Sequence, residues 1–225
     1  MAECRSKAKH LGEVFRLDAK AEGENVAIGG WRCREGRPTR EAEWFAVTLN
    51  RRNAAWAFAR GEAFRTIASL ELLGALVLVM VLLPLEEAGA ATMGLATLSC
   101  GTDNQGNSYL LDKLLTTKYP LGVILMEVAC QASRRRASLR ARWIPRLENE
   151  EADALTNGEF HHFRAENRIP VDLAKLEFIV LNELFDEGER YVKELEELRA
   201  CERRARNSGT AHAAKRAKGD RLAQL

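Results

Sequence analysis

Four acidic side chains stand where the sequence pattern places them in apolar or constrained surroundings. They are Asp18 at the end of an apolar strand, Glu71 between leucines, Asp103 just after a short strand, and Asp153 before Ala154 and Leu155. A charged side chain is costly to bury without a partner or a metal ion. Carboxylates brought together would repel one another unless divalent cations neutralised them, and Mg²⁺ or Mn²⁺ prefers oxygen ligands. A metal site is therefore one hypothesis. The alternative for each acid alone is an ordinary turn or cap residue.

The elements that would carry these acids alternate between strands and helices. Short runs rich in β-branched and aromatic residues predict strands at 13–19, 25–34, 43–50, 96–101 and 139–144. Helical periodicity predicts helices at 63–83, 108–117, 121–134 and from 149 to 156. This order indicates an α/β fold, a mixed sheet with helices on its faces.

The chain divides into four predicted parts. Residues 1–12 form an N-terminal extension with no apolar segment after it, so no signal peptide is expected. The α/β domain occupies 13–160. From 161 to 206 we expect a helical appendage, with a long charged helix from 171, and from 207 to 225 a basic tail that is expected to be disordered.

Composition excludes several classes of protein. The chain has 46% hydrophobic residues, enough for a core, and a net charge of only +2, so any nucleic-acid binding must come from local clusters. Its 5 cysteines show no C-x-x-C spacing, which argues against a disulfide scaffold or zinc ribbon and suggests a reducing, intracellular compartment, either nuclear or cytoplasmic. The apolar run at 72–85 is shorter than the about 20 residues that span a bilayer, and predicts a buried core helix and no membrane.

The contexts of the four acids resemble the ribonuclease H family in order. Phe-Arg-Leu-Asp18 followed by Ile-Gly-Gly-Trp31 is similar to that family's opening hairpin. Ser-Leu-Glu71-Leu-Leu resembles its first helix, and Thr-Asp103-Asn-Gln resembles its strand-end motif. Trp-Ile-Pro-Arg146 with Asn149-Glu-Glu-Ala-Asp153-Ala-Leu is similar to the last strand and helix of retroelement members. The resemblance covers about 13–158.

This resemblance implies a ribonuclease H-like mixed five-stranded sheet with helices on both faces, from a retroelement reverse-transcriptase polyprotein. It implies that Asp18, Glu71, Asp103 and Asp153 are catalytic and hold two Mg²⁺ ions, or Mn²⁺ in their place. The implied reaction is endonucleolytic hydrolysis of the RNA strand of an RNA–DNA hybrid. A polymerase domain of the same polyprotein is an expected partner. No His stands in the loop before the last helix, where many cellular members carry one.

Several polar side chains are candidates for nucleic-acid contact. Asn104, Gln105 and Asn149 are candidates for 2′-hydroxyl or base-edge contacts, because amides both donate and accept; an N-cap role for Asn149 is the alternative. Arg146 is a candidate phosphate contact. The cluster Arg134, Arg135 and Arg136, continued by Arg140 and Arg142 on the following strand, is either a phosphate-tracking ridge or a solvated face.

The tryptophans are expected to differ in role. Those at 31, 44 and 143 fall on predicted strands, so we expect them in the core. Trp56 lies in a basic loop, so it is a better candidate than the other three for stacking on nucleic-acid bases.

Two other functions stay open. A ribonuclease H-like domain that binds nucleic acid without catalysis would keep the fold. An integrase-type strand-transfer enzyme is disfavoured because its last acid is usually Glu, whereas here it is Asp153. A structural or interaction protein has only the charged helix from 171 to favour it.

Overall fold

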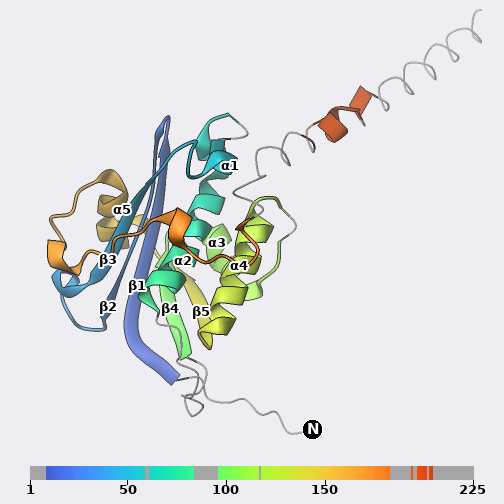
Figure 1. Cartoon of the computed structure of the whole chain (residues 1–225). Helices are drawn as coiled ribbons and strands as arrows, with labels where there is room; N and C mark the ends of the chain where they lie inside the picture. Colours follow the sequence, from blue (N-terminus) through green and yellow to red (C-terminus); the bar gives the residue numbers. More distant parts are fainter. Residues whose placement is uncertain are drawn as a thin grey trace, which may run out of the picture.

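The computed structural model of the chain describes residues 9–58, 61–83, 96–116, 118–182, 194, 197–201 and 203–204. Their strands form one sheet in the order β3-β2-β1-β4-β5 (Figure 1). The strands are β1 (Lys9–Glu22), β2 (Asn25–Arg34), β3 (Glu43–Leu49), β4 (Ala96–Thr102) and β5 (Ala137–Trp143). β1 pairs with β2, and β2 with β3, in antiparallel fashion, whereas β4 is parallel to both β1 and β5. The prediction of a mixed five-stranded sheet is confirmed.

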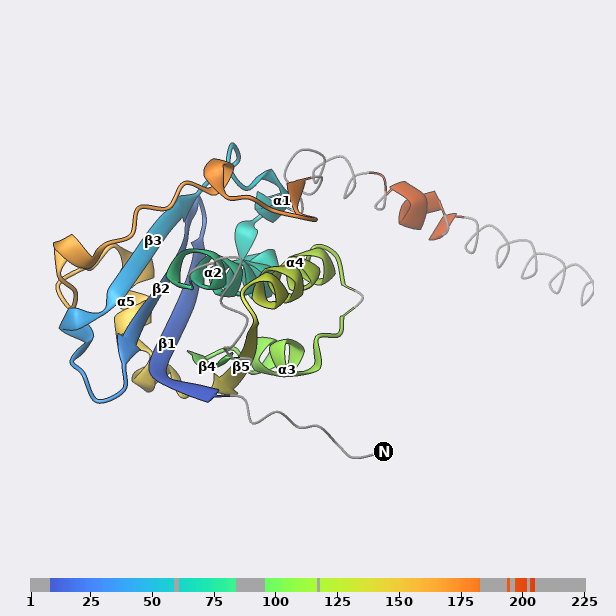
Figure 2. The ribbon, with the colours of Figure 1, turned by 60° about the horizontal axis from the view of Figure 1, so that its bottom comes forward.

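Helices lie on both faces of this sheet. They are α1 (Ala55–Phe58), α2 (Ile67–Leu82), α3 (Gln105–Lys113), α4 (Leu121–Arg134) and α5 (Glu150–Asn157). α2 contacts β1 and β2 and packs against α4, with α3 beside them, while α5 lies on the opposite face against β1 and β2 (Figure 2). The chain therefore has the ribonuclease H-like fold class that the resemblance implies.

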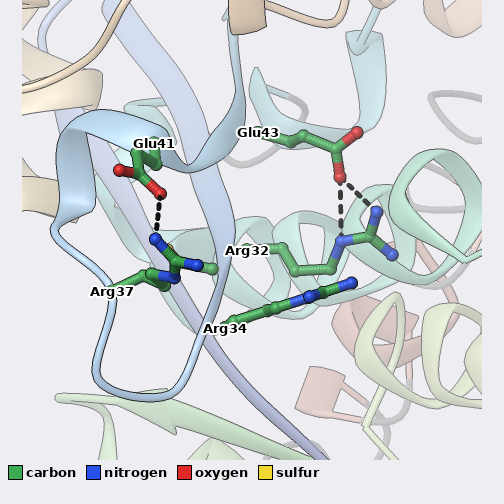
Figure 3. A pocket seen from close by; sticks show the side chains of 6 residues that line it. Arg32, Arg34, Arg37, Glu41 and Glu43 are labelled. Atoms are coloured by element: carbon green, nitrogen blue, oxygen red, sulfur yellow. Dashed lines mark hydrogen bonds and ion pairs between the residues drawn. The ribbon is translucent and has the colours of Figure 1, made fainter.

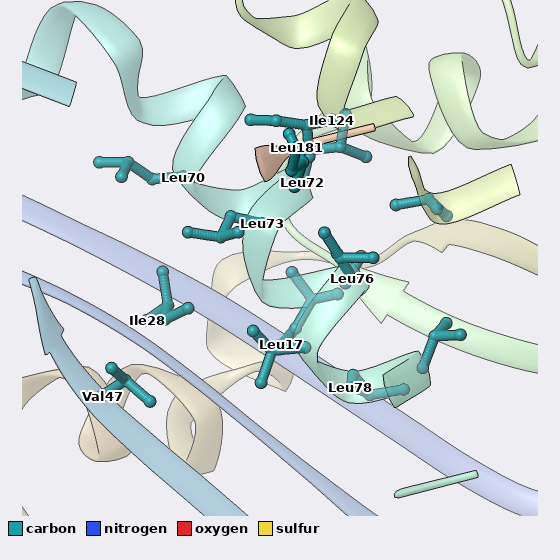
Figure 4. Packing of buried hydrophobic residues seen from close by; sticks show 14 of the residues in the cluster. Leu17, Ile28, Val47, Leu70, Leu72, Leu73, Leu76, Leu78, Ile124 and Leu181 are labelled. Atoms are coloured by element: carbon teal, nitrogen blue, oxygen red, sulfur yellow. The ribbon is translucent and has the colours of Figure 1, made fainter. Parts of the chain in front are cut away.

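α2 forms the centre of the larger core. Leu70, Leu73 and Leu76 are fully buried on it, among side chains from β1, β2 and α4 (Figure 4). The segment Ala63–Leu82 is long and apolar enough to cross a membrane, but 72% of its most apolar window is buried inside the protein. Burial on all sides explains its uniformly apolar sequence, and the predicted core helix is confirmed.

On the other face, α5 approaches the sheet closely at Gly29. A Cβ at this position would lie 2.8 Å from the Cβ of Leu155, closer than two carbon atoms can pack. Gly29 is also the residue of β2 that pairs with Asp18. The glycine therefore allows α5, which carries Asp153, to approach the strand that carries Asp18.

The tryptophans follow the expectations only in part. Trp31 and Trp44 are buried, in the cluster under α5, as predicted. Trp56 lies in α1 and is also buried, so the expectation that it stacks on bases is wrong. Trp143, at the end of edge strand β5, is 49% exposed rather than in the core, because the sheet ends beside it.

The chain after α5 differs from the helix expected from 171. Between 159 and 181 its only helical residues are those of the 3₁₀ turns Ala165–Asn167 and Leu173–Lys175. Ile169 donates its N–H to the carbonyl of Trp44 on β3, and Leu181 packs in the core with Leu72 and Ile124 (Figure 4). The predicted helix is therefore wrong over 171–181, because apolar side chains there find partners in the core.

A buried carboxylate anchors the end of this segment. Glu127 of α4 is inaccessible to solvent, and its oxygens accept the backbone N–H groups of Ile179 and Val180 at 2.6 to 3.0 Å. These bonds supply partners for the Glu127 carboxylate, which would be costly to bury without them. Beyond 182, the described residues at 194, 197–201 and 203–204 are helical. The predicted tail at 207–225 and most of the N-terminal extension at 1–12 lie outside the described residues.

Candidate active site

Asp18 is a buried carboxyl group in the middle of the sheet. It is 7% exposed, and its Oδ2 accepts a hydrogen bond from the Thr156 hydroxyl of α5 at 2.9 Å. Burial raises the pKa of Asp18 to about 6, and the neighbouring charges of Asp103 and Asp153 add to the increase. The Thr156 hydrogen bond acts in the opposite direction. Thr156 was not singled out from the sequence, although it lies one residue past Leu155.

Glu71 is the second buried carboxyl group, and it projects from α2 towards the end of β4. Its oxygens accept hydrogen bonds from Thr102 at 3.3 Å, Asn104 at 3.1 Å and Asn107 at 3.4 Å. Burial raises the pKa of Glu71 to about 7, against the opposite effect of the hydrogen bonds from Asn104 and Asn107. Asn107 also donates to the carbonyl of Ala68 at 2.8 Å, so it joins α3 to α2.

Asp103 and Asp153 are held at the rim of the same region. Asp103 directly follows β4, and its carbonyl accepts the indole N–H of Trp143 at 3.1 Å. Asp153 lies in the first turn of α5. Its Oδ1 accepts from Arg146 at 2.9 Å and its Oδ2 from Asn157 at 2.8 Å.

Hydrogen bonds bring the elements that carry the four acids together: Thr156 joins Asp18 to the carbonyl of Asp153, and Thr102 and Asn104, on either side of Asp103, both donate to Glu71. Asp103 contributes to the raised pKa of both Asp18 and Glu71, and Asp18 contributes to that of Glu71. The hydrogen bond to Asp153 raises the pKa of Arg146, with further contributions from Asp18 and Asp103. Four separate elements thus bring the sequence-predicted acids to one place, with Arg146 beside them.

The donor chemistry of this site suits a hard divalent cation, because every candidate ligand is a carboxylate oxygen. Among the described residues, however, no three His, Cys, Asp or Glu side chains are arranged to hold an ion as they stand. Asp153 is turned towards Arg146 and Asn157. Metal binding at all four carboxylates would require Asp153 to exchange Arg146 for the ion.

Of the three amide candidates, Asn104 and Gln105 lie near the surface and Asn149 is buried. Asn104 caps α3 by accepting the N–H of Asn107 at 3.0 Å, and it also donates to Glu71. Gln105 is exposed beside it. Asn149 is 1% exposed and donates to the carbonyl of Leu17 at 3.0 Å. Asn149 occupies the N-cap position of α5 without a capping bond, and it ties the start of that helix to β1.

The Arg134–Arg136 cluster lies far from the carboxylates. It precedes the first residue of β5, whereas Trp143 beside Asp103 ends that strand. Seven residues of strand separate the two ends by about 20 Å. Arg135 is buried, and its guanidinium donates to the carbonyls of Met80 and Leu83 at the end of α2. The expectation of a ridge formed by all three arginines is therefore wrong for Arg135, which has a structural role.

A separate polar pocket of about 390 Å³ lies at the β2–β3 hairpin (Figure 3). It is lined by Arg32, Cys33, Arg34, Arg37, Glu41 and Glu43. Arg32 forms an ion pair with Glu43, and Arg37 lies 3.6 Å from Glu41. Much of the charge in this pocket is therefore balanced internally.

No protein-family model matches the sequence, and no curated protein does. Among solved structures, ribonuclease H1 from the archaeon Halobacterium salinarum is 15% identical with a TM-score of 0.44, over 68% of this chain and 98% of that one. The N-terminal ribonuclease H domain of Rv2228c from Mycobacterium tuberculosis is 17% identical with a TM-score of 0.43, over 65% of this chain and 91% of that one. The ribonuclease H1 LC11, isolated from compost by a metagenomic approach and solved in complex with an RNA/DNA hybrid, is 16% identical with a TM-score of 0.44. The match covers 65% of this chain and 94% of that one. The fold of this chain rests on its own strand order and directions.

Proposed function

We propose that the chain is a metal-dependent endonuclease that hydrolyses the RNA strand of RNA–DNA hybrids. The observation that carries this proposal is the convergence of Asp18, Glu71, Asp103 and Asp153 from four elements of a ribonuclease H-like fold. Two of these carboxyl groups are buried, where the charged form is costly unless hydrogen bonds, a charged partner or a cation stabilise it.

In this mechanism the four carboxylates would hold two Mg²⁺ ions, or Mn²⁺ in their place. When bound, such ions activate the attacking water and stabilise the leaving oxygen of an in-line displacement at phosphorus. Asp18 and Glu71 must lose their protons to act as ligands, and their raised pKa makes that loss depend on pH. The Thr156 hydroxyl orients Asp18, and Thr102 and the two asparagines orient Glu71.

Substrate selection would fall to polar groups around the carboxylates. Asn104 and the exposed Gln105 lie at the start of α3, next to Asp103, and their amides suit 2′-hydroxyl groups in the wide minor groove of an A-like helix. Arg146, once released from Asp153, suits a backbone phosphate. Asn149 would act through its bond to Leu17 by positioning α5.

The wider context is also proposed. The pattern from Asn149 to Leu155 supports an origin in a retroelement reverse-transcriptase polyprotein, with a polymerase domain of that polyprotein as a partner. The absence of C-x-x-C pairs supports a reducing, intracellular site of action.

A second candidate is a domain of the same fold that binds hybrid without cutting it. The observation that favours it is the ion pair between Arg146 and Asp153, which occupies one of the four carboxylates. In that case the ion pair between Arg146 and Asp153 would persist in the presence of millimolar Mg²⁺.

The substitution Asp103→Asn tests the proposal. It removes the charge of one ligand while keeping nearly the same shape, so hybrid cleavage is expected to fall by at least about a hundredfold. Cleavage of a labelled hybrid in Mg²⁺ gives the rate, and circular dichroism checks the fold. Asp172→Asn, at an exposed turn, is the matched control and should keep full activity. Full activity in Asp103→Asn would refute the assignment.

A further inference from the structure

Arg16 is a half-buried guanidinium on the same strand and face as Asp18, two residues earlier. It pairs in register with Trp31 of β2 on one side and with Gly101 of β4 on the other. A Cβ at Gly101 would lie 2.7 Å from Nη1 of Arg16, so the guanidinium rests directly on the backbone of β4. Gly101 thus makes room for the cation.

The next strand places a second cation beside the first. Arg142 of β5 pairs in register with Gly101, and its side chain is exposed. Side chains of residues paired in this way point to the same face of the sheet. Arg16 and Arg142 therefore flank Gly101 in one row, and Asp18 lies about 7 Å from Arg16 along β1.

Among the described residues, neither arginine has a carboxylate within ion-pair distance. The interactions of Arg16 are a hydrogen bond to the carbonyl of Phe15 at 3.1 Å and a cation–π contact with Trp31 at 6.0 Å. A half-buried cation beside a like charge is stabilised by an anion.

In the described part of the chain, the side chains of β4 and β5 on this face of the sheet are partly or fully exposed. α5 packs on β1, β2 and β3, and on β4 and β5 the outward side chains are small or basic. Ser99 and Ser138 are partly exposed, and Arg140 is exposed and paired with Asp112 at 2.6 Å. Arg142 and Arg16 therefore form the basic part of this surface nearest to Asp18.

We propose that Arg16 and Arg142 form a phosphate-binding subsite for the nucleic-acid strand that crosses the carboxylates. The planar guanidinium groups suit the oxygens of a phosphodiester, and Gly101 permits the strand to approach the backbone of β4. The inference rests on the proposed function, because it takes the hybrid as the ligand and assigns two of its contacts.

The test is the salt dependence of hybrid binding by the full chain. Fluorescence anisotropy with a labelled hybrid is measured in Mg²⁺, in an Asp103→Asn background that leaves the hybrid uncut. Arg142→Gln and Arg16→Met are each expected to weaken binding about five- to tenfold at 0.1 M salt. Each should also reduce the slope of log K against log salt by about 1, the value of one phosphate contact. Arg16→Met keeps the apolar contact with Trp31.

Arg140→Gln is the matched control, because it lies on the same strand and face but its charge is already paired with Asp112. It should leave the slope unchanged. An unchanged slope in Arg142→Gln, or an equal decrease in Arg140→Gln, would overturn the subsite while leaving the proposed function intact. Absence of hybrid binding by the Asp103→Asn parent and by the wild-type chain would overturn both. If Arg16→Met fails to fold, the exposed Arg142 still decides the question.

Discussion

Asp18 and Glu71 determine how the metal-free protein responds to pH. Their pKa values of about 6 and about 7 lie above the ordinary values of these carboxyl groups, mainly because burial disfavours the charged form. The neutral forms therefore stabilise the fold at low pH. That contribution is complete below the ordinary pKa values and is lost as the pH rises through 6 and 7.

Glu71→Gln removes the ionisation while keeping one acceptor for the surrounding amides. At pH 8 the metal-free variant is expected to melt about 5 °C above the wild-type protein, because it carries no buried charge. At pH 4 the two should melt together, since Glu71 is neutral in the folded protein. Thermal denaturation in the presence of a chelator measures both values. An equal difference in melting temperature at the two pH values would show that the ionisation of Glu71 does not cause the difference.

Arg146 competes with any cation for Asp153. Replacement by Gln removes the guanidinium that lies 2.9 Å from Asp153 Oδ1. The Mg²⁺ concentration at half-maximal thermal stabilisation is expected to fall about two- to fivefold, in keeping with the strength of an exposed ion pair. Arg164→Gln, outside the site, is the control. A higher midpoint Mg²⁺ concentration in Arg146→Gln would contradict competition and show that Arg146 favours binding of the ion.

At the residue scale, the sequence identifies acids better than it identifies the environment of amides and arginines. Asp18 and Glu71 stand out because their neighbours along the chain are apolar. The burial of Asn149 and Arg135 depends on Leu17, Met80 and Leu83, which are remote in sequence. No local pattern carries that information.

At the scale of elements, the distance between α5 and the sheet determines the spacing of the site. Gly29→Ala would place a methyl group 2.8 Å from the Cβ of Leu155, so α5 must move away from β2. We expect a loss of about 2 kcal/mol in stability and a reduced cleavage rate, because Asp153 and Thr156 move with the helix. Chemical denaturation and the hybrid assay measure the two effects.

Gly74→Ala in α2 is the matched control. Its added Cβ would lie 3.8 Å from the nearest atom, an ordinary contact, and alanine favours the helix. The variant should be at least as stable as the wild-type protein. If Gly29→Ala were equally well tolerated, the close packing of α5 would not be needed to position the acids.

The strands and the central helix could be predicted because their periodicity is local. β1 was expected at 13–19 but extends over Lys9–Glu22, because it pairs with β4 from Lys9 and with β2 up to the turn at Gly23. The exposure of Trp143 follows from the position of β5 at the sheet edge, and strand order cannot be read from residue alternation alone.

At the scale of the whole molecule, the chain after α5 completes the domain. It passes along β3, through the bond between Ile169 and Trp44, and ends against α4, where Glu127 binds two of its backbone N–H groups. Its charged sequence favours a helix, but Phe178 and Leu181 are buried in the core. Contacts between distant segments decide its conformation, so its sequence alone predicts it poorly.

The most direct test of the account is cleavage of a labelled RNA–DNA hybrid by the full chain, beside single-stranded RNA and duplex DNA. Each substrate is incubated with Mg²⁺, with Mn²⁺ and with a chelator. The account predicts that the RNA strand of the hybrid is cut, that cutting needs a divalent ion, and that the other two substrates remain intact. An intact hybrid in both metals, or equal cutting of duplex DNA, would contradict it.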